Sequence, residues 1–312
     1  MYFPTADIEV AFWVPPLVAC VVSFFTSMGG VSGAFLLLPF QMSFLGYTSP
    51  SVSATNQLFN IVAIPGGVLR YCREGRMVWP LTGLVVAGTL PGVLLGALVR
   101  IAWLPDPRHF KLFAAAVLLY IGLKMAYDLL GRRRGPSRPE TPPATGGQPA
   151  TSATDHPQPA ATVQISHCSL RRLSYRFHDE EYVIPIWPVF FLSLVVGMIG
   201  GIYGIGGGAI IAPFLITFFK LPVHTVAGAT LMGTFVTSVA GVAFYQAIAP
   251  FYPQVTVAPD WLLGLLFGLG GMVGMYLGAR CQKYVPAGLI KAMLGAILLF
   301  TAGKYIISFL TA

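Results

Sequence analysis

Long apolar stretches constrain this chain more than any other feature of its sequence. Several reach the ~17–25 residues that a helix needs to cross a bilayer. They lack the period-two alternation of a barrel strand, and backbone groups in hydrocarbon must be paired within their own segment, so we expect helices. Only 10% of the 312 residues are charged, which is low for a soluble protein. The clearest stretches are 52–69, 78–99, 110–130, 189–219, 226–249, 261–279 and 289–310.

A polar stretch divides the apolar part of the chain. Residues 131–182 begin with three consecutive arginines, Arg132 to Arg134, and continue with many Pro, Thr, Ala, Gly and Gln residues. Such a composition buries too little apolar surface to fold alone, so a disordered linker is predicted. It separates a first transmembrane repeat, residues 1–130, from a second, residues 183–312.

The two halves match each other in sequence. Residues 30–40, GVSGAFLLLPF, correspond to residues 204–214, GIGGGAIIAPF, at an offset of 174. Residues 54–55 match 229–230 at 175, and residues 96–97 match 278–279 at 182. Offsets that change little along the chain indicate a duplication. Repeats of this kind are typical of transporters, whose substrate site lies between the halves.

The first segment of each half decides how the repeats are oriented. Residues 11–45 and 189–219 are both interrupted by glycines, so each is a broken span or a re-entrant hairpin. With a hairpin and three spans per half, the repeats are inverted. Fourteen Lys and Arg residues then lie in the cytoplasm, and Arg100, Arg108 and Lys111 lie outside. A parallel four-plus-four arrangement places ten Lys and Arg residues in the cytoplasm and seven outside. The positive-inside rule therefore favours the inverted, all-α bundle.

The glycine-rich interruptions are the strongest candidates for a binding site. Glycine adopts backbone angles that end a helix, and the next helix then begins inside the membrane. Its N-terminus presents unpaired N–H groups and the positive end of the helix dipole, which together suit an anion. The alternative is that these glycines serve close helix packing.

Polar side chains follow each interruption on one helical face. Ser53, Asn56, Gln57 and Asn60 form the first stripe, and Thr230, Thr234, Thr237 and Ser238 form the second. They line a shared cavity or bond neighbouring helices. The predicted substrate-binding residues are Gly30, Ser32, Gly33, Thr55, Asn56, Asn60, Gly206, Gly207, Gly208, Thr230 and Thr234.

Other classes of function find little support. The net charge of +8 comes largely from Lys and Arg in connections between apolar segments, where they set topology, so no nucleic-acid partner is expected. The four cysteines lack metal-ligand spacing, and no Ser/Lys or His/Asp cluster falls at membrane depth. We therefore expect no catalytic residue, metal or cofactor.

The chain resembles the TauE/SafE family of sulfite and organosulfonate transporters. The resemblance lies in Gly204-Ile-Gly-Gly-Gly with Pro213, in the related segment from Gly30 with Pro39, and in the two Ala-Thr pairs. It covers both halves and implies transport of a sulfur-containing anion. Ser32 and Ala34 depart from the glycines of the second half. Asn56, Gln57 and Asn60 stand where the second half has Leu231, Met232 and Phe235.

The leading hypothesis is a secondary carrier or facilitator for a small anion, sulfite or another sulfur oxyanion or organosulfonate. We expect it in a bacterial inner membrane with the linker in the cytoplasm. Its partners would be the anionic solute and the lipid bilayer, and a homo-oligomer stays open. The rival hypotheses are a non-transporting assembly or sensor subunit, which requires a closed core, and an intramembrane enzyme.

Overall fold

Apolar helices form most of the structure, a computed structural model. It describes residues 1–29, 32–73, 77–132, 164–168, 172–177, 180–281, 284–285 and 287–311. Within these residues, six helices are long and apolar enough to cross a membrane. The six are α5 (Trp79–Ala102), α6 (Pro107–Arg132), α7 (Ile186–Tyr203), α9 (Val223–Ile248), α10 (Trp261–Cys281) and α11 (Ala287–Leu310).

The shorter helices form where glycines or a proline interrupt an apolar stretch. The predicted single span 52–69 is two helices, because Pro65 has no N–H to continue the first one. Both glycine-containing first segments are also divided into two helices. No long helix therefore covers the predicted span 52–69, and α7 is the long helix within the predicted stretch 189–219. The set of membrane-length helices differs from the expected one at these two places. The short helices are α1 (Val14–Gly29), α2 (Ala34–Ser43), α3 (Ser51–Ala63), α4 (Pro65–Arg73) and α8 (Gly208–Thr217).

Part of the predicted linker is β-structure, which differs from the fully disordered segment expected. Three strands, β3 (Gln164–Cys168), β4 (Arg172–Phe177) and β5 (Glu180–Pro185), form an antiparallel sheet. The composition of the whole range conceals a local run in which Leu173 and Tyr175 are buried on one face of β4. Residues 133–163 lie outside the described part. Two short strands, β1 (Tyr2–Phe3) and β2 (Ile8–Glu9), pair near the N-terminus.

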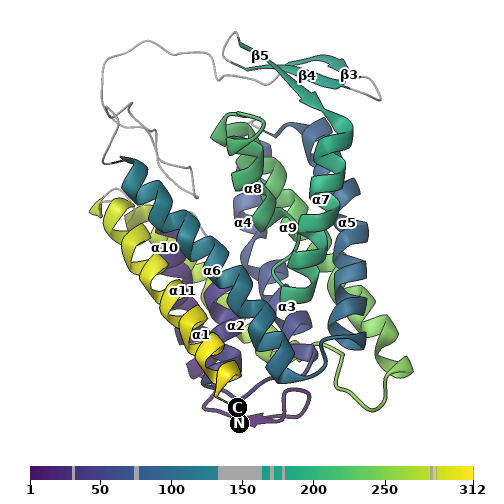
Figure 1. Cartoon of the computed structure of the whole chain (residues 1–312), viewed down its shortest axis with the longest axis vertical. Helices are drawn as coiled ribbons and strands as arrows, with labels where there is room; N and C mark the ends of the chain where they lie inside the picture. The colour runs from purple at the N-terminus through teal and green to yellow at the C-terminus, as the bar shows by residue number, and fades with distance from the viewer. Residues whose placement is uncertain are drawn as a thin grey trace.

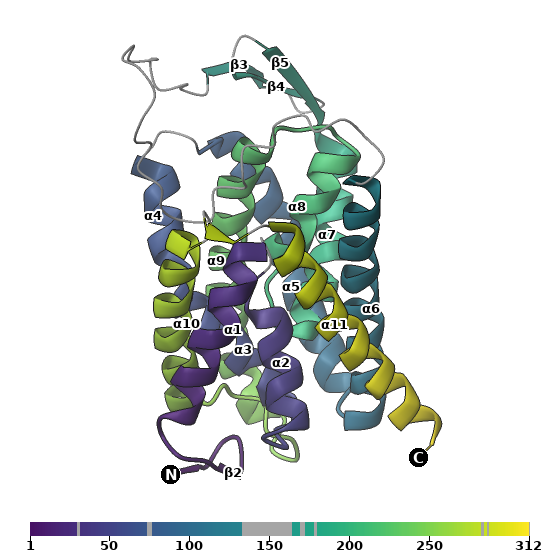
Figure 2. The same cartoon turned by 90° about the vertical axis from the view of Figure 1, so that its left-hand side faces the viewer.

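The two ends of the molecule differ in what they carry. Both chain termini lie at one end, and the β3–β5 sheet lies at the other (Figure 1). Turning the view by 90° shows the helices running between these ends, with α11 crossing obliquely (Figure 2). We call the first end the terminal end and the second the sheet end.

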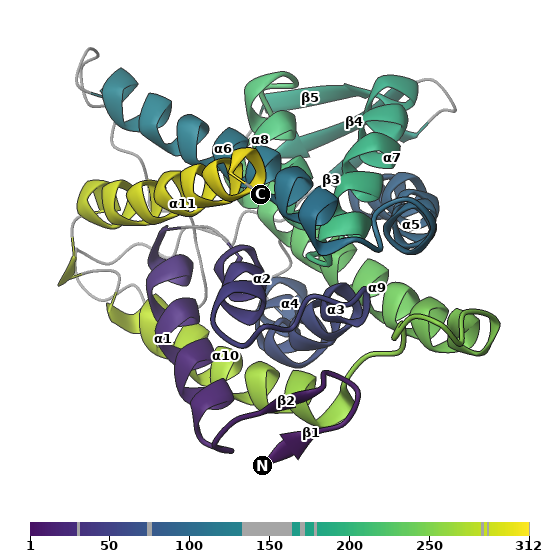
Figure 3. The ribbon, with the colours of Figure 1, turned by 60° about the horizontal axis from the view of Figure 1, so that its bottom comes forward.

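Helix packing pairs elements from opposite halves of the chain. Helix α1 packs on α10, α7 packs on α5, and α6 packs on α11, around a centre that contains α3 and α9 (Figure 3). Glycines permit the first two contacts. A Cβ on Gly92 would lie 2.3 Å from Leu194 O, and one on Gly274 would lie 2.1 Å from Cys20 O. Backbone therefore meets backbone at both interfaces.

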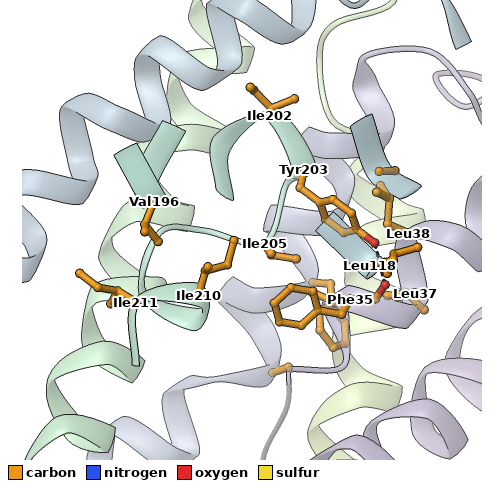
Figure 4. Packing of buried hydrophobic residues seen from close by; sticks show 14 of the residues in the cluster. Phe35, Leu37, Leu38, Leu118, Val196, Ile202, Tyr203, Ile205, Ile210 and Ile211 are labelled. Carbon is orange, nitrogen blue, oxygen red and sulfur yellow. Dashed lines mark hydrogen bonds between the residues drawn. The ribbon is translucent and has the colours of Figure 1, made fainter. Parts of the chain in front are cut away.

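The apolar core gathers where the two interrupted segments approach each other. Phe35 and Leu37 of α2 pack near Tyr203 and Ile205 of the other half (Figure 4). The Tyr203 hydroxyl donates a hydrogen bond to Phe35 O at 2.8 Å, joining the end of α7 to the start of α2. This contact fixes the two interruptions relative to each other.

Candidate functional site

The second interruption is a sharp break between α7 and α8. Helix α7 ends at Tyr203, and Gly204 follows with a left-handed φ of 83° while its N–H bonds Gly200 O at 2.8 Å. A side chain there would be strained, and its Cβ would lie 2.4 Å from Ser53 O. Gly206 is also left-handed, at a φ of 73°, and α8 begins at Gly208. The predicted interruption is therefore present.

The start of α8 is fully enclosed by protein. Gly206, Gly207 and Gly208 are all buried. Gly207 N donates to Thr237 Oγ1 at 3.2 Å, and a Cβ on Gly208 would lie 2.0 Å from Thr230 O. The first turn of α8 thus lies directly against α9, with its N–H end in the interior.

The first interruption has the same order of elements with different side chains. Helix α1 ends at Gly29 and α2 begins at Ala34, while Gly30 lies outside the described residues. Ala34 N donates to Ser32 Oγ at 3.3 Å, so the serine side chain bonds the first residue of α2, whose N-cap is Gly33. A Cβ on Gly33 would lie 2.8 Å from Ser23 Oγ, so a larger residue there would require the Ser23 side chain to shift.

Helix α3 connects the two interruptions through fully buried amides. Asn56 Nδ2 donates to Ala34 O at 3.1 Å, and Asn60 Nδ2 donates to Ile205 O at 3.0 Å. Ser53 Oγ donates to Ile202 O at 2.9 Å. A carbonyl oxygen can only accept, so these contacts fix which amide atom is nitrogen. One face of α3 therefore donates hydrogen bonds to backbone carbonyls of both halves.

Several polar atoms near α3 are buried without a partner. Gln57, which is 0% exposed, has no hydrogen bond at either Oε1 or Nε2 within the described residues. Asn60 Oδ1 and Gln41 Oε1 are also unpaired there. A buried amide without a partner costs roughly 1–3 kcal/mol. Such unpaired groups mark a place where a polar guest would be stabilised.

The stripe on α9 is largely bonded within its own helix. Thr234 Oγ1 donates to Thr230 O at 2.9 Å, and Thr230 Oγ1 donates to Val226 O at 3.0 Å. Both threonines are buried beside the start of α8. Their hydroxyl oxygens retain acceptor capacity, but their protons are engaged.

Not all predicted site residues come together. Thr55 points away from the interruptions and bonds Tyr47 OH at 2.9 Å and Asp260 N at 2.9 Å. Asp260 in turn caps α10, since its Oδ1 accepts from Leu263 N at 2.9 Å. The described members Ser32, Gly33, Asn56, Asn60, Gly206, Gly207, Gly208, Thr230 and Thr234 surround the two interruptions.

Sequence reasoning missed three buried residues. Gln41 of α2 reaches Asn56 Oδ1 at 3.5 Å, and Tyr203 bonds Phe35 O. Arg100, taken as an outside loop charge, is 0% exposed in the last turn of α5. The signal for Arg100 was its position inside an apolar run, where a charge is costly without a role.

Comparison with known proteins identifies the group to which this fold belongs. The model of the sulfite exporter TauE/SafE family matches residues 16–305. The chain belongs to the TauE/SafE family. With six membrane-length apolar helices in the part of the chain that the structure describes, this TauE/SafE chain is an integral membrane protein, and the family is one of membrane transporters.

Curated relatives of this TauE/SafE protein are similar over part of their length. The probable membrane transporter protein YdhB of Bacillus subtilis is 27% identical over 120 residues, 38% of this chain and 44% of the relative. MJ0441 of Methanocaldococcus jannaschii, also named a probable membrane transporter protein, is 23% identical over 130 residues, 40% and 46% respectively. The matches thus span less than half of either relative. No solved structure matches the chain.

Proposed function

We propose that this TauE/SafE protein is a secondary carrier or facilitator for a small oxyanion, sulfite or an organosulfonate. The observation that supports it most is the start of α8 at Gly208, inside the protein, near Asn60 of α3, whose buried Oδ1 has no hydrogen-bond partner among the described residues. A helix N-terminus at such a place favours negative charge through its N–H groups and dipole. The family description names sulfite, which fits this chemistry.

The packing supports the inverted repeat that we propose for the transport cycle. Gly92 and Gly274 correspond at an offset of 182, and the carbonyls they meet, Leu194 and Cys20, correspond at 174. The α5–α7 contact thus has an equivalent in the α10–α1 contact. Each of these two contacts joins a helix of one half to a helix of the other, so the groups that we propose to rock about the site each contain helices of both halves.

The charge distribution supports one orientation in the membrane. We place the terminal end outside and the sheet end, with residues 131–182, in the cytoplasm of a bacterial cell. This orientation follows the positive-inside rule, since most Lys and Arg residues then face the cytoplasm. Lipid and the anion are the partners that this proposal requires, whereas a homo-oligomer remains a separate proposal.

A second candidate function rests on the same hydrogen bonds. The amide nitrogens of Asn56 and Asn60 and the hydroxyl of Thr234 all donate to protein carbonyls. A non-transporting assembly or sensor subunit would need such a self-bonded core. This candidate predicts that purified protein in lipid vesicles gives no sulfite flux.

The test uses Gln57, because its side chain makes no hydrogen bond to any described residue that a substitution would remove. In proteoliposomes loaded with labelled sulfite, we expect Gln57→Met to fold normally and to lower flux about tenfold or more, the effect of one lost interaction of ~1.4 kcal/mol. Thr301→Val is the matched control, since the Thr301 hydroxyl bonds Ile297 O within α11. Wild-type flux in Gln57→Met would contradict the proposed site, and absent flux in the wild type would favour the second candidate.

A further inference from the structure

Arg100 is a buried cation whose charge is not balanced by a carboxylate within the described residues. Its guanidinium donates to Leu104 O and, at 3.1 Å, to Thr48 O, and lies 3.7 Å from the centre of the Phe110 ring. These contacts occupy the two terminal nitrogens. Arg100 Nε, also buried, has no partner among the described residues.

The surroundings of Arg100 supply further donors. Tyr47 precedes Thr48, whose carbonyl accepts from the guanidinium, and Tyr245 packs in one cluster with Ala97 and Ile101 of α5. Ser49, next to the carbonyl that Arg100 bonds, has a buried hydroxyl that no described residue contacts by a hydrogen bond. The Tyr245 hydroxyl is buried beside Ser53 without a hydrogen bond of normal geometry in the described residues.

The buried carboxylate in this region is already engaged. Asp260 Oδ1 accepts from Leu263 N at 2.9 Å, and Oδ2 accepts from Ala6 N at 3.3 Å. Both carboxylate oxygens of Asp260 therefore accept from backbone N–H groups. A guanidinium whose Nε–H has no partner among the described residues, next to hydroxyl donors, suits a planar or tetrahedral oxyanion.

A line of polar side chains connects Arg100 with the interruption between α7 and α8. Helices α3 and α9 run past each other, and Asn60 lies 3.5 Å from Ser238 Oγ. Gln57 is the next contact, against Gly241 of α9. One turn further, Ser53 lies beside Tyr245, which packs against the α5 residues that flank Arg100.

An apolar cluster flanks the buried Arg100. Ala97 and Ile101, its neighbours on α5, form one cluster with Ala54, Tyr245 and Val257. Val257 also lines a surface hollow of about 280 Å³ formed by residues 249 and 252–258. Val257 therefore connects the hollow with the apolar cluster next to Arg100.

We propose that Arg100 and Tyr245 form a second anion site, which binds the small oxyanion between the hollow at the terminal end and the interruption between α7 and α8. This inference rests on the proposed transport function. When the 249–258 segment moves aside, the anion binds the free Nε–H of Arg100 and the Tyr245 hydroxyl. Gln57 then leads it towards the start of α8.

The experiment measures the apparent KM for labelled sulfite in proteoliposomes at equal protein content. For Arg100→Gln we expect KM to rise about tenfold to a hundredfold, as the loss of a charge-assisted hydrogen bond predicts, and for Arg100→Lys a smaller rise. A purely structural Arg100 would lower the yield of folded protein and the maximal rate while KM stayed constant. Arg108→Gln, which removes an exposed cation at the same end, is the control.

Tyr245→Phe keeps the inference testable if Arg100 variants fail to fold. It removes one oxygen that bonds no described residue, and we expect KM to rise about three- to tenfold with normal folding. Wild-type KM in the folded Arg100 and Tyr245 variants, with flux present and Gln57→Met impaired, would overturn the Arg100 site alone. Absent flux in the wild type would instead contradict the transport function.

Discussion

At the residue scale, the glycines of this protein fall into groups with different physical roles. Gly204 and Gly206 have left-handed backbone angles, so they end one helix and allow the turn to the next. Gly92 and Gly274 are helical, and they are required because another backbone lies within van der Waals distance. Gly83 has open space where a Cβ would lie. Replacing glycine by alanine should therefore have different effects on stability at these positions.

The contrast between Gly92 and Gly83 on helix α5 gives a direct prediction. Gly92→Ala forces a Cβ to within 2.3 Å of Leu194 O and 2.9 Å of Met198 N, neither of which is a flexible side chain. We expect α5 and α7 to separate, at a cost of at least ~1–3 kcal/mol. The measurement is the thermal unfolding midpoint of purified protein in detergent, which should fall.

Gly83→Ala is the matched control on the same helix. Alanine favours a helix over glycine by up to about 1 kcal/mol, so the midpoint should stay constant or rise slightly. Equal midpoints for the two variants would show that the backbone contact between α5 and α7 does not stabilise the protein.

At the element scale, the β3–β5 sheet is attached to the helices by a specific polar contact. The Tyr175 hydroxyl lies 2.9 Å from Thr225 Oγ1 in the first turn of α9. Thr225 Oγ1 donates to Pro222 O at 2.9 Å, so Tyr175 is the donor. Burial raises the pKa of Tyr175 to about 12, which keeps this proton in place at neutral pH.

This attachment can be tested without changing the helices. Tyr175→Phe should cost ~0.5–1.5 kcal/mol, the net worth of one hydrogen bond, and the β4 amides should exchange hydrogen faster while α9 amides do not. In the wild type, the contribution of Tyr175 to the free energy of unfolding is complete below pH 10, the ordinary Tyr pKa. It is lost as the pH rises towards 12, the pKa in the folded protein. Unchanged exchange in β4 would show that other contacts hold the sheet.

The elements also show what the sequence could predict. Residues 189–219 were expected to break at their glycines, and α7 and α8 do so because glycine there has left-handed angles. The division of α3 from α4 at Pro65 was missed, because the apolar run continues through it. The β3–β5 strands were missed, because the composition of 131–182 as a whole suggested disorder.

The site was harder to predict than the fold, for physical reasons. Helical spacing placed Asn56 and Asn60 on one face, but it could not show that their nitrogens bond backbone of both halves. Thr55 shares their helix yet faces Asp260, since one residue changes the direction by about 100°. Arg100 looked like a loop charge, and only the packing of Phe110 and the 44–50 loop makes it buried.

At the scale of the whole molecule, the account joins these features into one path. The terminal end has the hollow and Arg100, the centre has the two interruptions joined by α3, and the sheet end has the β-structure attached through Tyr175. Rocking of the α1–α10 group against the α5–α7 group would expose the centre to each end in turn. The glycine interfaces, where backbones touch, limit that motion to rigid groups of helices.

The central claim is that the start of α8 binds an anion, and an experimental structure of the protein in lipid nanodiscs with sulfite tests it most directly. We expect density for an oxyanion within hydrogen-bond distance, about 2.7–3.2 Å, of the N–H groups that begin α8, close to the Gln57 side chain. The density should be absent from Gln57→Met prepared in the same way. The contradicting result would be a structure at saturating sulfite in which protein alone occupies this position. It would count against the account if the same preparation transports sulfite.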